Sequence, residues 1–174
     1  YNGDISRPFR ETNYQPEVLL GYNPDITFGG WRWRLATLSF NHQSNGRADP
    51  LSRSWNRLIG GVAVERGGFV FQARAWHRFS EDDNKDDNPD ITDYMGYGDL
   101  TALYRTGGGH TFKAMGRGNL GKGKGAGEFT WSSPPVLGPV RLYAQIFTGY
   151  GESMIDYNWN QTTIGAGITL NDLF

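Results

Sequence analysis

The strongest constraint on this chain is a period-two alternation of apolar and polar residues. It is clearest in "RLATLSFNH", "GGFVFQARAWHRF" and "GPVRLYAQIFTGYG". Successive side chains of a β-strand point to opposite faces of the sheet, so this period is typical of strands whose two faces meet different surroundings. Segments with the 3.6-residue period of an amphipathic helix are hard to find. The pattern therefore predicts an all-β, antiparallel fold.

Turn signals rich in Gly, Pro, Asn and Asp separate the alternating stretches, among them "NGRADP", "EDDNKDDNPD" and "SPPVLGP". Counting the stretches between them gives about nine strands, with "YQPEVLLGYNPDITF" taken as one of them. We expect these strands to form a single domain over residues 1–174.

Composition excludes several classes of protein. The chain has no cysteine, which argues against a disulfide scaffold or a zinc site, and its net charge of −1 gives no basic surface for nucleic acid. No apolar run approaches the roughly 18 to 20 residues that a membrane helix needs. The chain is therefore either soluble or inserted in a membrane by strands.

The residues between the apolar ones favour a membrane barrel. In "VRLYAQIFTGY" one face carries Val140, Leu142, Ala144 and Ile146, and the other carries Arg141, Tyr143, Gln145 and Phe147. Polar and charged residues suit a hydrogen-bonded barrel lumen, while the apolar face suits lipid. Alternation alone does not decide the question, so a soluble β-sandwich or a lipocalin-like binding module stays open.

The C-terminal stretch points the same way. Ile164, Ile168, Leu170 and the terminal Phe174 share one parity, which resembles the C-terminal signal of bacterial outer-membrane barrels, although Asp172 departs from it. A closed barrel leaves no unpaired strand edge in the bilayer, and bacterial single-chain barrels have even strand numbers. We therefore expect either that strands precede Tyr1 or that the count of nine is wrong by one.

The stretch "FNHQSNGRADPLSRSWNRL" carries polar residues on an apolar face. Leu38 and Phe40 place even positions on the lipid side, and His42 and Ser44 continue that side. Asn56 shares the parity of Leu58 on the returning strand.

A hairpin that is symmetric about Asp49 and Pro50 places His42 opposite Asn56 and Ser44 opposite Ser54. Directly opposed side chains lie about 4.5 to 5.5 Å apart at Cβ. The imidazole Nε2 of His42 could then reach Ser44 while Asn56 accepts from Nδ1, as the third residue of an acyl-transfer triad does. The alternative is an ordinary polar hairpin, but polar side chains facing lipid usually serve a function.

The segments "NHQSNGR" and "DPLSRSWNRL" resemble the active-site hairpin of the outer-membrane phospholipase A family. The likeness continues through "PFRETNYQPEVLLGY", "DDNPDITDYMGY" and "GYGESMIDYNWNQTTIGAGITLNDLF". The resemblance implies a twelve-stranded transmembrane barrel in the bacterial outer membrane, which fits the expectation of missing N-terminal strands. It also implies that His42 is the general base, Ser44 the nucleophile and Asn56 the residue that orients the histidine, with the Gly46 amide donating to the oxyanion.

The same resemblance implies calcium and a homodimer. The calcium ligands would be the main-chain carbonyl of Arg47, the side chain of Ser52, and Ser6 supplied by the partner subunit. Asp49 and Asp87 resemble the carboxylates of a second calcium position. The loop before Asp87 is longer than the family pattern, so Asp86 and Asp90 remain alternatives to it.

The leading hypothesis is therefore a calcium-dependent serine hydrolase that removes acyl chains from phospholipids and lysophospholipids in the outer membrane and is activated by dimerisation. A non-catalytic porin-like or adhesin-like barrel is the alternative. It explains the alternation, but it leaves the three outward polar residues without a role.

Overall fold

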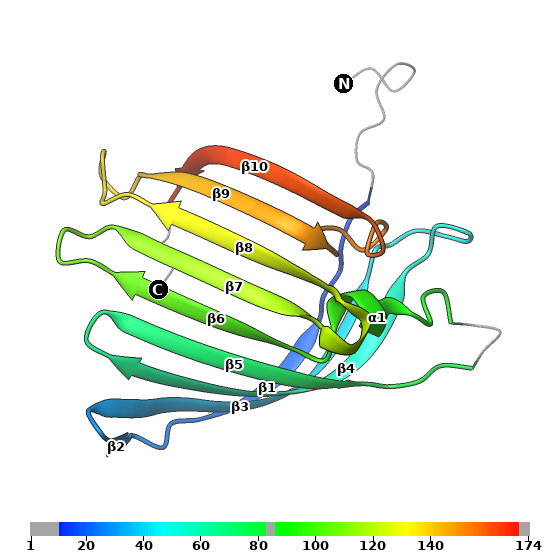
Figure 1. The fold of residues 1–174 in the computed structure, drawn as a ribbon, viewed down its shortest axis with the longest axis horizontal. Coiled ribbons are helices and arrows are strands. Elements are labelled where there is room, and N and C mark those ends of the chain that lie inside the picture. Colours follow the sequence, from blue (N-terminus) through cyan, green and yellow to red (C-terminus); the bar gives the residue numbers. More distant parts are fainter. Residues whose placement is uncertain (1–10, 83–85, 171–174) are drawn as a thin grey trace.

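The structure is a computed structural model that describes residues 11–82 and 86–170. Ten strands form one antiparallel sheet (Figure 1). They are β1 (Glu17–Tyr22), β2 (Ile26–Phe28), β3 (Trp31–Ser44), β4 (Ser54–Arg66), β5 (Phe69–Arg78), β6 (Gly98–Arg105), β7 (Thr111–Asn119), β8 (Lys124–Ser132), β9 (Arg141–Tyr150) and β10 (Asn160–Thr169). A short helix α1 (Ile91–Met95) precedes β6, and a 3-10 turn η1 (Leu120–Lys122) joins β7 to β8.

Neighbouring strands in the sheet are mostly neighbours in sequence. The order is β1-β3-β4-β5-β6-β7-β8-β9-β10, and β2 pairs with β3 beside β1. Within the described residues the sheet is open, with β1 and β10 at its edges. No helix in this part of the chain is long and apolar enough to cross a membrane.

The strand count of about nine was wrong by one. The stretch taken as a single strand is divided into β1 and β2 at Asn23, Pro24 and Asp25. Proline has no N–H to give to the sheet, and Asp25 has a φ of 53°, so the backbone leaves the extended conformation there. Helix α1 was not expected either, because five residues are too few to show a helical period. Asp172 and Phe174 lie outside the described residues.

The two faces of the sheet differ as the alternation predicts. One face exposes apolar side chains, such as Leu38, Phe40, Leu58, Val62, Leu142 and Ile146. The other buries polar ones: Arg57 donates to Asn41 Oδ1 at 2.7 Å, and Lys113 pairs with Glu128 at 2.8 Å. An apolar outer face with a hydrogen-bonded inner face is the arrangement of a transmembrane β-barrel wall.

A compact apolar cluster lies on the inner face near the end of the sheet where the longer loops gather. Its members are Trp55, Ile59, Trp76, Ile91, Met95, Met154 and Tyr157. The first three come from strands and the others from α1 and the segment between β9 and β10. In Figure 1, α1 lies against this end, beside the long connections between β3 and β4 and between β5 and β6. The loops there are therefore packed onto the strands that carry the polar hairpin.

Candidate active site

The β3–β4 hairpin has the register that the sequence predicts. His42 pairs with Asn56 and Ser44 with Ser54. His42 Nδ1 lies 2.9 Å from Asn56 Oδ1. Since the amide oxygen can only accept, the imidazole donates from Nδ1, and its lone pair is then on Nε2. His42 thus has the tautomer that a general base needs.

Ser44 is the next residue on the same face. Its Oγ accepts a hydrogen bond from the Gly46 amide at 3.2 Å. In the described part of the chain no hydrogen bond joins Ser44 to His42. Catalytic hydrogen bonds are often long without substrate and tighten in the complex. The Gly46 amide therefore points at the Ser44 hydroxyl oxygen.

The backbone around Ser44 is fixed from both sides. β4 pairs with it on one side, and on the other Tyr14 exchanges two main-chain hydrogen bonds with it, at 2.8 and 2.9 Å. Gly46 has a φ of +62°, and a Cβ there would lie 2.7 Å from Tyr14 Cε2. Glycine is therefore required at position 46 for both backbone conformation and space.

Asn45 holds the loop 45–53 together, and sequence reasoning missed it. This fully buried side chain accepts from the amides of Arg47 and Arg53 at 3.2 and 3.0 Å and donates to the Leu51 carbonyl at 2.8 Å. An asparagine that accepts from the amide two residues on makes an Asx-turn, and the Asn-Gly pair was the signal for it.

The candidate calcium ligands lie on two loops that meet. Arg47, Asp49 and Ser52 are in the loop 45–53, and Asp87 is in the loop that follows β5. The buried Asn88 accepts from the Ser54 amide at 2.9 Å, which ties the second loop to the start of β4. Ser6 lies outside the described residues.

The three carboxylates of the loop after β5 differ in whether they have a partner within the described residues. Asp86 pairs with Arg78 at 2.6 Å and accepts from the Asn88 amide at 3.1 Å. Asp90 accepts from the Tyr157 hydroxyl. Asp87 is half-buried, and its carboxylate has no partner among the described residues, so of the three it is the one left available to a cation.

The ligand chemistry suits a hard cation. Across residues 11–82 and 86–170, no three His, Cys, Asp or Glu side chains are grouped to hold a metal. A site here would instead combine carboxylates with hydroxyl and main-chain oxygens, which is a donor set that Ca²⁺ accepts. The Ser52 hydroxyl has no partner within the described part of the chain.

Comparison with known proteins identifies the family of the chain. The family model described as phospholipase A1 matches residues 1–170. The chain belongs to the phospholipase A1 family. It is 47% identical over 173 residues to phospholipase A1 of Escherichia coli K12, and the match covers 99% of this chain and 58% of that protein. The chain therefore spans little more than half the length of this curated relative.

Solved structures of the family have the same fold. The Salmonella typhi outer membrane phospholipase, a dimer with bound calcium, matches with a TM-score of 0.91 and 47% identity over 99% of this chain and 66% of that one. An active-site mutant of the Escherichia coli enzyme, in which an asparagine is replaced by alanine, matches with a TM-score of 0.89 and 47% identity, covering 96% and 63%. The sheet described here is accordingly part of an outer-membrane β-barrel.

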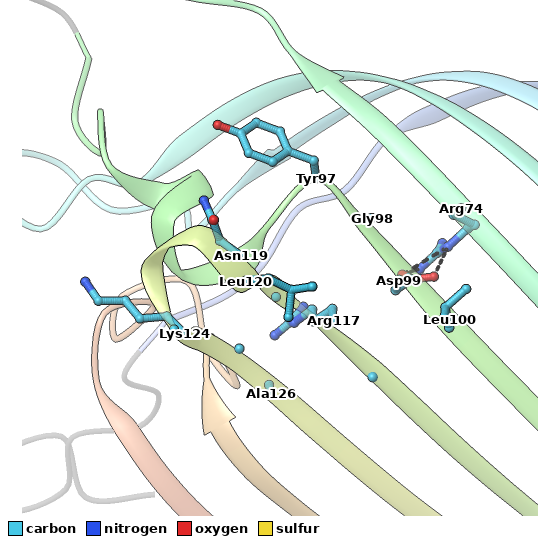
Figure 2. Close-up of a pocket in the computed structure, with 14 residues that line it drawn as sticks. Arg74, Tyr97, Gly98, Asp99, Leu100, Arg117, Asn119, Leu120, Lys124 and Ala126 are labelled. Carbon is cyan, nitrogen blue, oxygen red and sulfur yellow. Dashed lines mark hydrogen bonds and ion pairs between the residues drawn. The ribbon is translucent and has the colours of Figure 1, made fainter.

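A pocket of about 860 Å³ lies away from the hairpin, on β6, β7 and β8. Figure 2 shows Arg74 and Asp99 joined across β5 and β6, with Asn119 and Lys124 nearer α1. Arg74 Nε donates to Asp99 Oδ1 at 3.0 Å. Five of the residues that line this pocket are glycines: Gly98, Gly116, Gly118, Gly123 and Gly125.

Proposed function

We propose that the protein is a calcium-dependent outer-membrane phospholipase that hydrolyses acyl ester bonds of phospholipids and lysophospholipids. The main support is the hydrogen bond between His42 Nδ1 and Asn56 Oδ1, beside Ser44 on the lipid-facing side of the sheet. A phospholipid reaches that face laterally, within the leaflet, so no channel through the barrel is needed. Family membership supplies the reaction class.

Ser44 Oγ attacks the ester carbonyl while His42 Nε2 takes its proton. The Gly46 amide donates to the oxyanion of the tetrahedral intermediate, and His42 returns the proton to the leaving alcohol. Water then attacks the acyl-serine while His42 takes its proton, and the acyl–Oγ bond breaks, releasing the fatty acid as His42 returns the proton to Ser44 Oγ. Asn56 keeps the imidazole in its tautomer without adding a charge of its own, so it stabilises the imidazolium less than an aspartate would.

The main-chain carbonyl of Arg47 and the side chain of Ser52 would hold calcium, together with Ser6 of the partner subunit, and Asp49 and Asp87 would belong to a second calcium position. When bound, calcium supplies positive charge that stabilises the oxyanion. Within the described residues the Asp87 carboxylate has no partner, whereas Asp86 pairs with Arg78 and Asp90 accepts from Tyr157, which supports Asp87 over the other two. Losing one oxyanion-stabilising group typically costs about 2.7 to 4 kcal/mol in the barrier.

A homodimer would join two lipid-facing surfaces and complete the calcium site. The solved Salmonella typhi relative is a dimer with calcium. Exposed apolar residues on β3 beside the hairpin, with Leu38 and Phe40 each 49% exposed, support an outer face able to take a second copy there. We expect sedimentation in detergent to show dimers with calcium and substrate analogue, and monomers with chelator.

Hydrolysis of a phospholipid in detergent micelles tests the proposal. The full-length protein is compared with Ser44→Ala, each with calcium and with chelator. Ser54→Ala is the matched control, because it removes a serine hydroxyl directly opposite Ser44 on the same face. We expect activity only in wild type and Ser54→Ala with calcium. Equal rates in wild type and Ser44→Ala would instead favour a porin-like or adhesin-like barrel.

A further inference from the structure

The side-chain amide of Asn56 makes a second hydrogen bond that the triad does not explain. Its Nδ2 donates to Glu81 Oε1 at 3.3 Å, while its Oδ1 accepts from His42. We propose that Glu81 is a positioning residue for the hydrolytic site, which fixes the orientation of the Asn56 amide and through it the tautomer of His42. This inference rests on the proposed function.

An asparagine in this position has two orientations of nearly equal shape. With the carbonyl oxygen towards His42, Nδ1 carries the proton and Nε2 is a base. With the amide nitrogen towards His42, Nδ1 must accept a hydrogen bond and Nε2 carries the proton. Nε2 then cannot take the proton of the Ser44 hydroxyl. In serine proteases, replacing the triad aspartate by asparagine leaves the geometry intact but lowers kcat about 10⁴-fold through this wrong tautomer. An asparagine triad therefore needs something that prevents the flip.

Glu81 has the chemistry to do this. An ionised carboxylate can only accept hydrogen bonds, so only the NH₂ group of Asn56 can face it. The carbonyl oxygen must then face His42, which leaves the lone pair of His42 on Nε2. The negative charge also polarises the amide, because neighbouring hydrogen bonds in a chain strengthen one another. The groups thus follow one another in the order Glu81 carboxylate, Asn56 amide, His42 imidazole and Ser44 hydroxyl.

The fold places Glu81 for this contact. The register pairs Arg57 with Arg78, and the Phe79 amide donates to the Asn56 carbonyl at 2.9 Å, which extends the β4–β5 pairing past the end of β5. Alternation then puts Glu81, two residues after Phe79, on the outer side with Asn56. The ion pair between Arg78 and Asp86 holds the backbone on the inner side.

The test compares side chains at position 81 that can accept a hydrogen bond from Asn56 with side chains that cannot. In the full-length protein with calcium, we expect Glu81→Ala to lower kcat about 10- to 100-fold and to change KM by no more than about twofold. A loss of this size is typical when a residue that hydrogen-bonds to a metal ligand is removed. Glu81→Gln, whose own carbonyl can accept, should keep most of the activity. Glu81→Lys, which can only donate, should fall at least as far as Glu81→Ala. Glu152→Ala is the matched control, a glutamate at the same end of the sheet that binds Gln161.

A double-mutant cycle separates positioning from folding. In an Asn56→Ala background, Glu81→Ala should lower kcat no further, because there is no amide left to orient. The inference is overturned if wild-type hydrolysis depends on Ser44 but Glu81→Ala keeps full kcat, acts through KM alone, or lowers kcat equally in both backgrounds. Equal activity of Glu81→Gln and Glu81→Lys also overturns it. If wild-type hydrolysis does not depend on Ser44, the proposed function fails, and this inference fails with it.

Discussion

The two ends of the sheet are built differently. At the end that carries His42 and Ser44, long loops bury polar side chains, and Asn45 and Asn88 are fully inaccessible. At the other end the connections 67–68 and 106–110 are shorter, and none of their residues is buried. Side-chain hydrogen bonds to the main chain occur at the second end too, such as the one from the His110 amide to Thr106 Oγ1 at 3.2 Å. At the first end such bonds also join one loop to another part of the chain, as Asn88 does by accepting from the Ser54 amide at 2.9 Å.

Side chains on the inner face of β3 and β4 stabilise the strands that carry the site. Trp55 lies between Ser54 and Asn56 on β4, and Gln43 lies between His42 and Ser44 on β3. Trp55 is 0% exposed and its Nε1 donates to Gln43 Oε1 at 2.9 Å. One cross-strand pair on the inner face thus fixes the strands whose outer face carries His42, Ser44 and Asn56.

The largest stability effect is expected at Trp55. Trp55→Ala removes the largest fully buried side chain and the Gln43 hydrogen bond, and should lower the free energy of unfolding by about 3–5 kcal/mol. Urea unfolding in lipid vesicles measures this. Trp159→Ala, at a tryptophan that is 66% exposed, is the control and should change little. Similar losses for both variants would mean that the inner cluster does not support the site end.

The next effect is expected at Asn45. Asn45→Ala leaves two amides and a carbonyl of the loop 45–53 without their partner, and should cost about 1–3 kcal/mol with a clear loss of kcat/KM. Asn158→Ala, at an exposed asparagine, should alter neither quantity. Unchanged hydrolysis in Asn45→Ala would show that loop order is not needed for catalysis.

Tyr157 gives a smaller effect that depends on pH. Burial, and then the hydrogen bond to Asp90, raise the pKa of the Tyr157 phenol. A raised pKa means that the folded state favours the neutral phenol, so its contribution is complete below the ordinary value of about 10 and is lost at higher pH. Tyr157→Phe should lower stability by about 1 kcal/mol at pH 7. Unfolding measured from pH 8 to 12 should fall more steeply for wild type than for the variant.

The smallest effect is expected at the short-turn end. Inserting Gly-Ser after Gly107 should change kcat/KM by less than about twofold, because exposed turns tolerate insertion. The same insertion after Ala48 should abolish hydrolysis. If both insertions had the same effect on kcat/KM, the contrast between the ends would not hold.

The sequence predicted the parts of the site that depend on strand parity. Alternation placed His42, Ser44 and Asn56 on one face, because a one-residue slip would turn every side chain to the wrong side. The assumption of a hairpin symmetric about Asp49 and Pro50 gave the register that the structure shows. It could not predict Asn45, Asn88 or Glu81, whose contacts depend on loop conformation and join segments distant in sequence. The break between β1 and β2 was also missed, although Pro24 was a visible signal.

Covalent labelling of Ser44 tests the central claim most directly. The full-length protein with calcium is treated with a long-chain alkyl fluorophosphonate, and mass spectrometry locates the adduct. The account predicts a single adduct on Ser44 that is lost in Ser44→Ala and strongly reduced in His42→Ala, in parallel with hydrolysis. An adduct on another serine, or full hydrolysis without any label on Ser44, would contradict it.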